Sequence, residues 1–192
     1  MINSYHEDIR SYSVACLPEL IRVAGKAELN SNDLILISNQ AIELLLNALT
    51  REDSMDIIIT ILQSINSTLI YTSTNWSLKD AHSVSENFKQ YLTGEQIAKL
   101  LSDLRLVLNE SIQRRAVLKA EGQVSGDFND EDEEDQGEQL VENLEIYFNI
   151  GELLTSLMQT QKENTIAPFE SVFYELVCSM SHPYCLMEDR YY

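Results

Sequence analysis

Hydrophobic residues recur at three- and four-residue spacing along most of the chain, which is the pattern of helices that pack through one face. The first such segment runs from about His6 to Ala24. Its apolar positions predict one buried face made of Ile9, Tyr12, Cys16, Leu20 and Val23. Pro18 lies inside this segment, where a proline removes a backbone hydrogen bond, so we expect a kink or break there. Gly25 is the expected C-terminal stop.

The next two segments predict helices over residues 33–50 and 54–73. The first of these carries two apolar stripes and is therefore expected to be sandwiched between neighbours on both sides. The second contains the isoleucine cluster Ile57–Ile61, which also has strand propensity. Its periodicity persists for about 18 residues, longer than ordinary strands, and this favours a helix.

Two longer helices are predicted over 94–120 and 138–162, and a last one begins at Thr165 with Pro168 in its first turn. Thr93 and Gln96 form a capping box at the start of the first of these. Residues 76–92 are interpreted as an insertion with a short amphipathic helix of its own. Because no segment alternates with period two over a useful length, the predicted fold class is all-α.

The predicted helices form two pairs, 33–50 with 54–73 and 94–120 with 138–162. The pair starts are 61 residues apart, and omitting the insertion brings this interval close to the 40–47 residues typical of HEAT and armadillo repeats. The spacing suggests an α-solenoid of stacked antiparallel helix pairs but does not by itself establish a repeat.

Charge is the unusual feature of the composition. The 192 residues include 13 Lys and Arg against 31 Asp and Glu, a formal net charge of -18. Such a field repels nucleic acids and anionic membrane surfaces and attracts basic proteins. We therefore expect basic protein partners, with no nucleic acid and no membrane among the partners.

Seven of the nine residues from Asp127 to Asp135 are carboxylates. Like charges repel and few apolar groups are present, so residues 122–137 are predicted to be a solvated, mobile acidic loop. Its function would be to bind something basic. The candidate interaction residues are Asp127, Asp130, Glu131, Asp132, Glu133, Glu134 and Asp135.

The sequence offers little catalytic or metal-binding chemistry. It has no glycine-rich phosphate loop and no nucleophile motif, and we predict neither an enzyme nor a bound cofactor. Cys178, His182 and Cys185 are three potential zinc ligands where a structural site needs four. The acidic run has Asp132 where a calcium-binding EF-hand loop starting at Asp127 needs glycine. Three cysteines without framework spacing indicate reduced thiols in the cytosol or nucleus. We predict no secretion signal and no membrane-spanning segment.

Several short motifs of the chain can be compared with those of known families. They are His6-Glu7-Asp8-Ile9-Arg10 leading into Cys16-Leu17-Pro18-Glu19-Leu20, then Ile146 to Leu154, Ala167-Pro168-Phe169-Glu170, and His182-Pro183 with Asp189-Arg190. Together they resemble karyopherin-β nuclear transport receptors, specifically the C-terminal half of the importin-β3 (importin five) branch. The motifs occur in the same order as in that family, and the resemblance covers nearly the whole chain except 76–92.

The resemblance implies that residues 1–192 are a HEAT-repeat segment of a longer solenoid, with the insertion 76–92 and the acidic loop 122–137. It implies a receptor that shuttles between cytoplasm and nucleus, carries basic cargo such as ribosomal proteins and histones, and is regulated by the Ran GTPase at pores built of nucleoporins. Two alternatives stay open. One is a HEAT scaffold subunit of a cytosolic phosphatase or coat assembly with a solubilising acidic loop, and the other is an acidic histone chaperone.

Overall fold

The computed structural model describes residues 6–27, 31–79, 92–124, 130–161 and 166–180. All regular secondary structure within these ranges is helical, which confirms the all-α prediction. The helices are α1 (Glu7–Lys26), α2 (Ser31–Leu49), α3 (Met55–Lys79), α4 (Gly94–Val124), α5 (Asp130–Thr160), the short 3-10 helix η1 (Ala167–Phe169) and α7 (Glu170–Met180).

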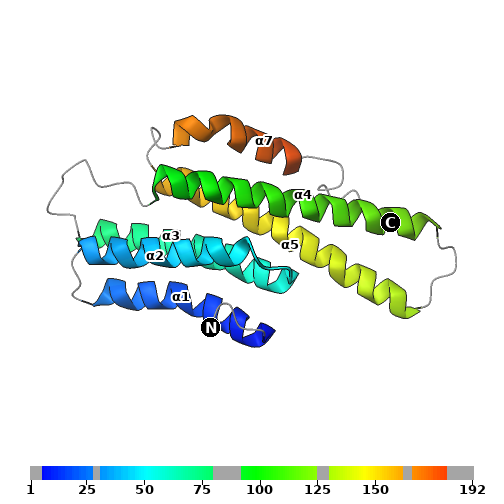
Figure 1. Ribbon diagram of the computed structural model, residues 1–192, viewed down its shortest axis with the longest axis horizontal. Coiled ribbons are helices and arrows are strands. Elements are labelled where there is room, and N and C mark those ends of the chain that lie inside the picture. Colours follow the sequence, from blue (N-terminus) through cyan, green and yellow to red (C-terminus); the bar gives the residue numbers. More distant parts are fainter. Residues whose placement is uncertain (1–5, 28–30, 80–91, 125–129, 162–165, 181–192) are drawn as a thin grey trace.

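The helices stack along one direction, with α1 at one end and α7 at the other (Figure 1). They form two layers. In the first layer α2 packs on α4 and α4 packs on α7, and in the second α1 packs on α3 and α3 packs on α5. Antiparallel pairs α2–α3 and α4–α5 connect the layers. This is the predicted arrangement of stacked helix pairs.

The core runs between the two layers through α2, α3, α4 and α5. Its members are the stripes predicted from periodicity, and Leu45, Ile61, Leu104 and Leu153 are each 0% exposed. The isoleucine cluster of α3 is helical and buried, so the choice of helix over strand is confirmed. Helix α2 buries most residues of both stripes, as expected for a sandwiched helix, although Ile35 and Ile37 are only partly buried and Leu44 is 50% exposed.

The capping box at the start of α4 is also confirmed. The backbone N–H of Gln96 donates to Thr93 Oγ1 at 3.2 Å, and the Thr93 N–H donates to Gln96 Oε1 at 3.0 Å. These two bonds satisfy backbone donors that a helix start leaves open. Nearby, the Leu92 N–H donates to the side chain of Gln161 at 3.3 Å, which joins the start of α4 to the end of α5.

Helix α1 differs from its prediction in two ways. It continues without a break through Pro18 to Lys26, and Gly25 lies inside the helix rather than at its end. Pro18 and Gly25 are both buried in the contact made by α1. Tertiary packing along the helix therefore outweighs the loss of one backbone hydrogen bond at the proline.

The predicted buried face of α1 is wrong. Its buried residues are Val14, Pro18, Ile21 and Gly25, whereas Ile9, Tyr12, Leu20 and Val23 are 41, 74, 60 and 57% exposed, and Cys16 is exposed too. We call the set Ile9, Tyr12, Cys16, Leu20 and Val23 the outer stripe. The physical reason is that α1 carries apolar residues on two opposite sides, and α3 together with α2 covers the side that the periodicity argument did not choose.

Two further boundaries differ from expectation. Helix α3 continues to Lys79, so the first residues of the expected insertion belong to it, and residues 80–91 lie outside the described ranges. Helix α5 begins at Asp130 rather than near residue 138.

Candidate protein-interaction surface

The acidic run predicted to bind a partner lies at the turn between α4 and α5. Both helices are 31 residues long, against 19 for α2, so each spans about 46 Å at 1.5 Å per residue. Figure 1 shows the α4–α5 hairpin extending past the ends of α1, α2 and α3 on one side. The start of α5 is at this projecting end.

The expected loop over 122–137 is much shorter in the structure. Helix α4 runs to Val124 and α5 starts at Asp130, which leaves residues 125–129 between them. Most of the carboxylates are consequently helical: the first two turns of α5 contain Asp130, Glu131, Asp132, Glu133, Glu134 and Asp135. Asp127 lies outside the described residues.

The helical state of the acidic run has a simple cause. The N-terminal end of a helix carries a partial positive charge from its unpaired backbone N–H groups, and carboxylates there are stabilising. Glu is also a good helix former, and the apolar stripe that follows from Leu144 anchors α5 against α3 and α4. The predicted loop was based on repulsion among the carboxylates and did not include their stabilisation by the N-terminal end of the helix or the anchoring of α5.

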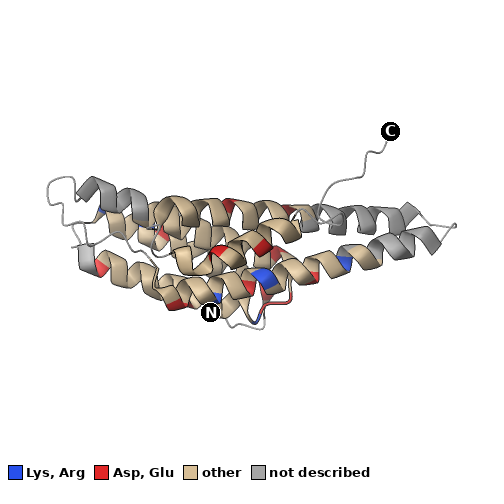
Figure 2. Cartoon of the chain, turned by 90° about the horizontal axis from the view of Figure 1, so that it is seen from above, with Lys and Arg blue, Asp and Glu red and all other residues tan. Residues whose placement is uncertain are grey.

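Several basic residues in the described ranges form intramolecular ion pairs or hydrogen bonds. Arg22 forms an ion pair with Glu19 at 2.6 Å, Arg105 pairs with Glu175, and Lys99 donates to the side chain of Asn47. Acidic residues outnumber basic ones along the helices, as Figure 2 shows.

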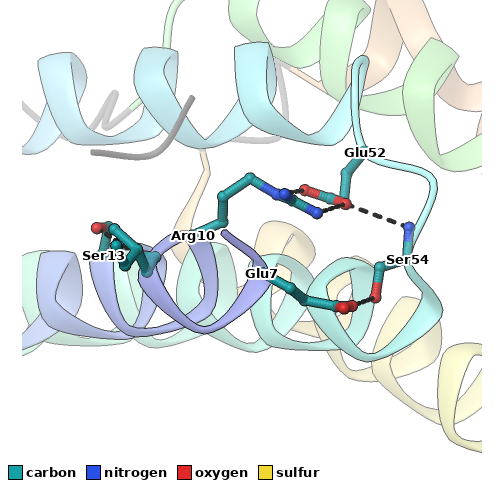
Figure 3. Close-up of polar contacts among 6 residues, drawn as sticks. Glu7, Arg10, Ser13, Glu52 and Ser54 are labelled. Atoms are coloured by element: carbon teal, nitrogen blue, oxygen red, sulfur yellow. Dashed lines mark hydrogen bonds and ion pairs between the residues drawn. The ribbon is translucent and has the colours of Figure 1, made fainter. Parts of the chain in front are cut away.

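One polar junction positions α1 on the rest of the stack (Figure 3). Arg10 donates from Nε and Nη2 to the two carboxylate oxygens of Glu52, at 2.9 and 3.0 Å. The Ser54 N–H donates to Glu52 at 3.2 Å, and the Ser54 hydroxyl donates to Glu7. Two-point binding of a carboxylate by Arg fixes orientation as well as distance, so this junction sets how α1 meets the α2–α3 turn. Periodicity gave no signal for it, because the junction joins two residues of α1 to residues that lie 42 or 47 positions further along the sequence.

A second polar contact lies where α4 passes the end of α2. Asp103 is 8% exposed, and its Oδ2 is buried without a hydrogen-bond partner. Burial raises the pKa of Asp103, and the nearby Lys99 and Thr50 counteract this only in part. The carboxylate is thus a cost to the fold when it is ionised.

The described part of the chain contains neither a metal-binding cluster of side chains nor a membrane-spanning helix. Among the residues that the structure describes, no group of three or more His, Cys, Asp or Glu side chains could hold a metal ion. Cys178 is exposed on α7, while His182 and Cys185 lie outside the described ranges. None of the described helices is long and apolar enough to cross a membrane.

The two-layered stack of antiparallel helix pairs defines an α-solenoid of the HEAT type. A family model described as Importin repeat 6 matches residues 77–181, which is more than half of the chain and contains α4, η1, α7 and the whole of α5. The chain belongs to this family of importin repeats. Neither the curated proteins nor the solved structures yielded a match.

Membership in this family supports a nuclear transport receptor scaffold, a class of protein that is generally not enzymatic and that binds cargo and Ran. It does not support the alternative of a phosphatase or coat scaffold. The matched range begins at residue 77, so it includes most of the segment interpreted as an insertion, and it also includes all of the acidic candidate residues.

Proposed function

We propose that this chain is a segment of a longer nuclear import receptor of the importin-β3 branch, and that the acidic start of α5 binds basic cargo. Ribosomal proteins and histones are cargo of the required charge. The observation that carries the proposal is the position of Asp130 to Asp135: they open a helix at the projecting end of a hairpin that lies inside the family-matched range.

The mechanism is electrostatic complementarity. A basic segment that approaches the end of the hairpin meets several carboxylates in two turns of helix, within a molecule of net charge -18. Such attraction speeds association and weakens as salt is added. Because the Debye length is about 8 Å at physiological ionic strength, only a partner already close to the hairpin is attracted by it.

A segment of a longer solenoid should have ends that are not capped by polar residues. Both ends of this stack have exposed apolar side chains, on α1 as described above and on α7 at Tyr174 and Val177, which are 73 and 54% exposed. These features favour a segment over a closed domain.

Cargo binding is tested by fluorescence anisotropy with a labelled histone-tail peptide, titrated with the chain at several salt concentrations. We expect binding that weakens steeply with salt and drops at least tenfold when the carboxylates at 130–135 are changed to Asn and Gln. A control variant carries the same number of neutralised carboxylates at exposed positions elsewhere, namely Asp8, Glu43, Asp53, Asp56, Glu95 and Glu110. Equal losses of peptide affinity in the two variants would show that net charge alone causes the binding, and this would refute a site at the start of α5.

Regulation by Ran and passage through the pore are properties of the whole receptor in this proposal. We expect the receptor to shuttle between cytoplasm and nucleus, and its cargo to be released by Ran bound to GTP. A pulldown from cell extract should recover Ran, nucleoporins and ribosomal proteins with the receptor. Histone recovery that does not respond to Ran and GTP would instead favour a histone chaperone.

A further inference from the structure

We propose that Phe148, flanked by Glu145 and Glu152 on α5, is an anchor for an arginine side chain of a basic protein segment that lies along this helix. The inference rests on the proposed function, since it takes α5 to be a surface that binds basic cargo. It adds a second point of contact, the kind of side chain bound there, and the length of segment that reaches both points.

Phe148 is 67% exposed, on a turn of α5 whose position is fixed by its neighbours. Tyr147 and Asn149, the residues on either side of it, are buried. The side-chain Nδ2 of Asn149 donates to the backbone carbonyl of Glu145 at 2.7 Å, within the same turn. An aromatic side chain has few rotatable bonds, so a ring presented on a rigid turn loses little conformational entropy when a partner binds it.

The last helix of the stack does not cover this ring. Gly151 follows Phe148 by three positions, which places the two residues about 60° apart around the helix axis. A Cβ atom added at Gly151 would lie 3.5 Å from the Cε atom of Met180, at the end of α7, so α7 already packs against that side of α5. Phe148 is therefore exposed even though the neighbouring side of its helix is occupied.

Two exposed carboxylates flank the ring. Glu145 lies three positions before Phe148 and Glu152 four positions after it, so all three share one side of the helix, with about 5–6 Å between adjacent Cβ atoms. Among the residues that the structure describes, neither carboxylate forms an ion pair. Helix α5 contains no Lys or Arg, and α3, which packs against it, contains only Lys79, its last residue. A cation supplied by a partner can therefore contact the ring and these carboxylates together.

Arginine fits this combination of groups better than lysine. The guanidinium group is planar, so it can stack on an aromatic ring while the N–H groups at its edge donate to carboxylates beside the ring. The face of an aromatic ring attracts cations, and arginine is found there more often than lysine. A lysine ammonium is more strongly hydrated and gives up more when it leaves water. The anchor therefore selects arginine over lysine at equal net charge.

The distance along α5 sets the length of the partner segment. Residues 135 and 148 are separated by about 20 Å at 1.5 Å per residue. An extended chain covers this distance in about six residues at roughly 3.3 Å each. The partner is therefore a basic segment whose arginine lies at least about six residues from the basic residues bound at the acidic start of α5.

The test compares two labelled peptides by fluorescence anisotropy. One is a histone-tail peptide, and the other is the same peptide with every arginine replaced by lysine, which keeps its net charge. The parent chain should bind the arginine peptide about threefold more tightly, as one exposed cation–π contact predicts. Phe148→Ala should remove this preference, and Phe148→Trp should keep it because tryptophan binds cations best. Met158→Ala is the matched control, since Met158 is 66% exposed on the same helix and has no ring.

The anchor would be overturned if Phe148→Ala kept the arginine preference, if Phe148→Trp lost it, or if Met158→Ala removed it equally. Self-association of the chain that depends on Phe148, measured by sedimentation, would show that a second copy covers the ring and would also overturn the anchor. Neutralising the carboxylates at 130–135 should weaken both peptides and leave the arginine preference in place. If that variant instead bound as the parent does while Phe148→Ala lost the preference, the site at the start of α5 would fail and the anchor would stand.

Discussion

The orientation of α1 can be tested by two identical substitutions in one helix, Val14→Ala and Val23→Ala. Val14 is 0% exposed and belongs to the main core, whereas Val23 is 57% exposed on the outer stripe. Both changes remove the same atoms and replace a β-branched residue by the best helix former, so the gain in helix propensity, up to about 0.5 kcal/mol, is common to the two variants.

The expected magnitudes follow from burial. Removing two buried methyl groups costs about 1.6 kcal/mol in transfer free energy, and the cavity left behind adds to this, so Val14→Ala should lose about 2 kcal/mol. At Val23 more than half of the side chain is already in water, and the smaller loss is largely offset by helix propensity. Its free energy of unfolding should change by less than about 0.5 kcal/mol.

The assay is urea denaturation followed by circular dichroism, with thermal melts as a second measurement. For 150–250 residues, 1 kcal/mol corresponds to about 2–4 °C, so Val14→Ala should lower the melting temperature by roughly 4–8 °C while Val23→Ala leaves it nearly unchanged. Unchanged denaturant slopes would show that both variants unfold as the parent does. A larger loss at Val23 than at Val14 would refute the orientation of α1 and with it the assignment of the outer stripe.

Three further predictions concern polar contacts. Burial raises the pKa of Asp103 in the folded chain, so ionisation of this carboxyl destabilises the fold as the pH rises from below the ordinary carboxyl range. Asp103→Asn should therefore increase the free energy of unfolding at pH 7, and this gain should shrink on acidification. The control Glu110→Gln, at an exposed position of the same helix, should show no such trend. Thr93→Ala should lower the free energy of unfolding by about 1 kcal/mol in urea denaturation because the helix cap is missing, and a loss below roughly 0.3 kcal/mol would contradict the capping geometry. Arg10→Met should lower the melting temperature more than Arg22→Met, since it removes two hydrogen bonds and the compensating charge from the mostly buried Glu52 carboxylate, whereas the Arg22 pair is exposed. Equal effects of the two substitutions would count against the junction.

The sequence predicts which residues make up the candidate surface and their charge, but it does not predict that these residues are helical. A dense run of carboxylates is visible in any reading of residues 127–135, and its preference for basic partners follows from charge alone. Its helical state depends on the anchoring of α5 by residues from Leu144 onward and on the helix dipole at Asp130. Whether the run binds cargo is a prediction for the anisotropy experiment.

Features that depend on interactions between residues close in sequence could be predicted from the sequence. The Thr93–Gln96 capping box, the helical choice for Ile57–Ile61 and the buried stripes of α2, α3 and α4 all follow from spacing and propensity, and all are confirmed. Each of these features is decided within a few turns of one helix. The sequence by itself therefore determined the class of fold, the positions of most helices and the acidic character of the surface.

Tertiary structure decided which of several apolar faces is used. Periodicity showed apolar residues on α1, but only the packing of α3 and α2 against this helix selected Val14 and Ile21 over the outer stripe. The Arg10–Glu52 junction likewise joins residues that are distant in sequence. The physical reason is that burial is a property of neighbours: a stripe becomes core only where another helix covers it, and a pattern within one helix does not specify that neighbour.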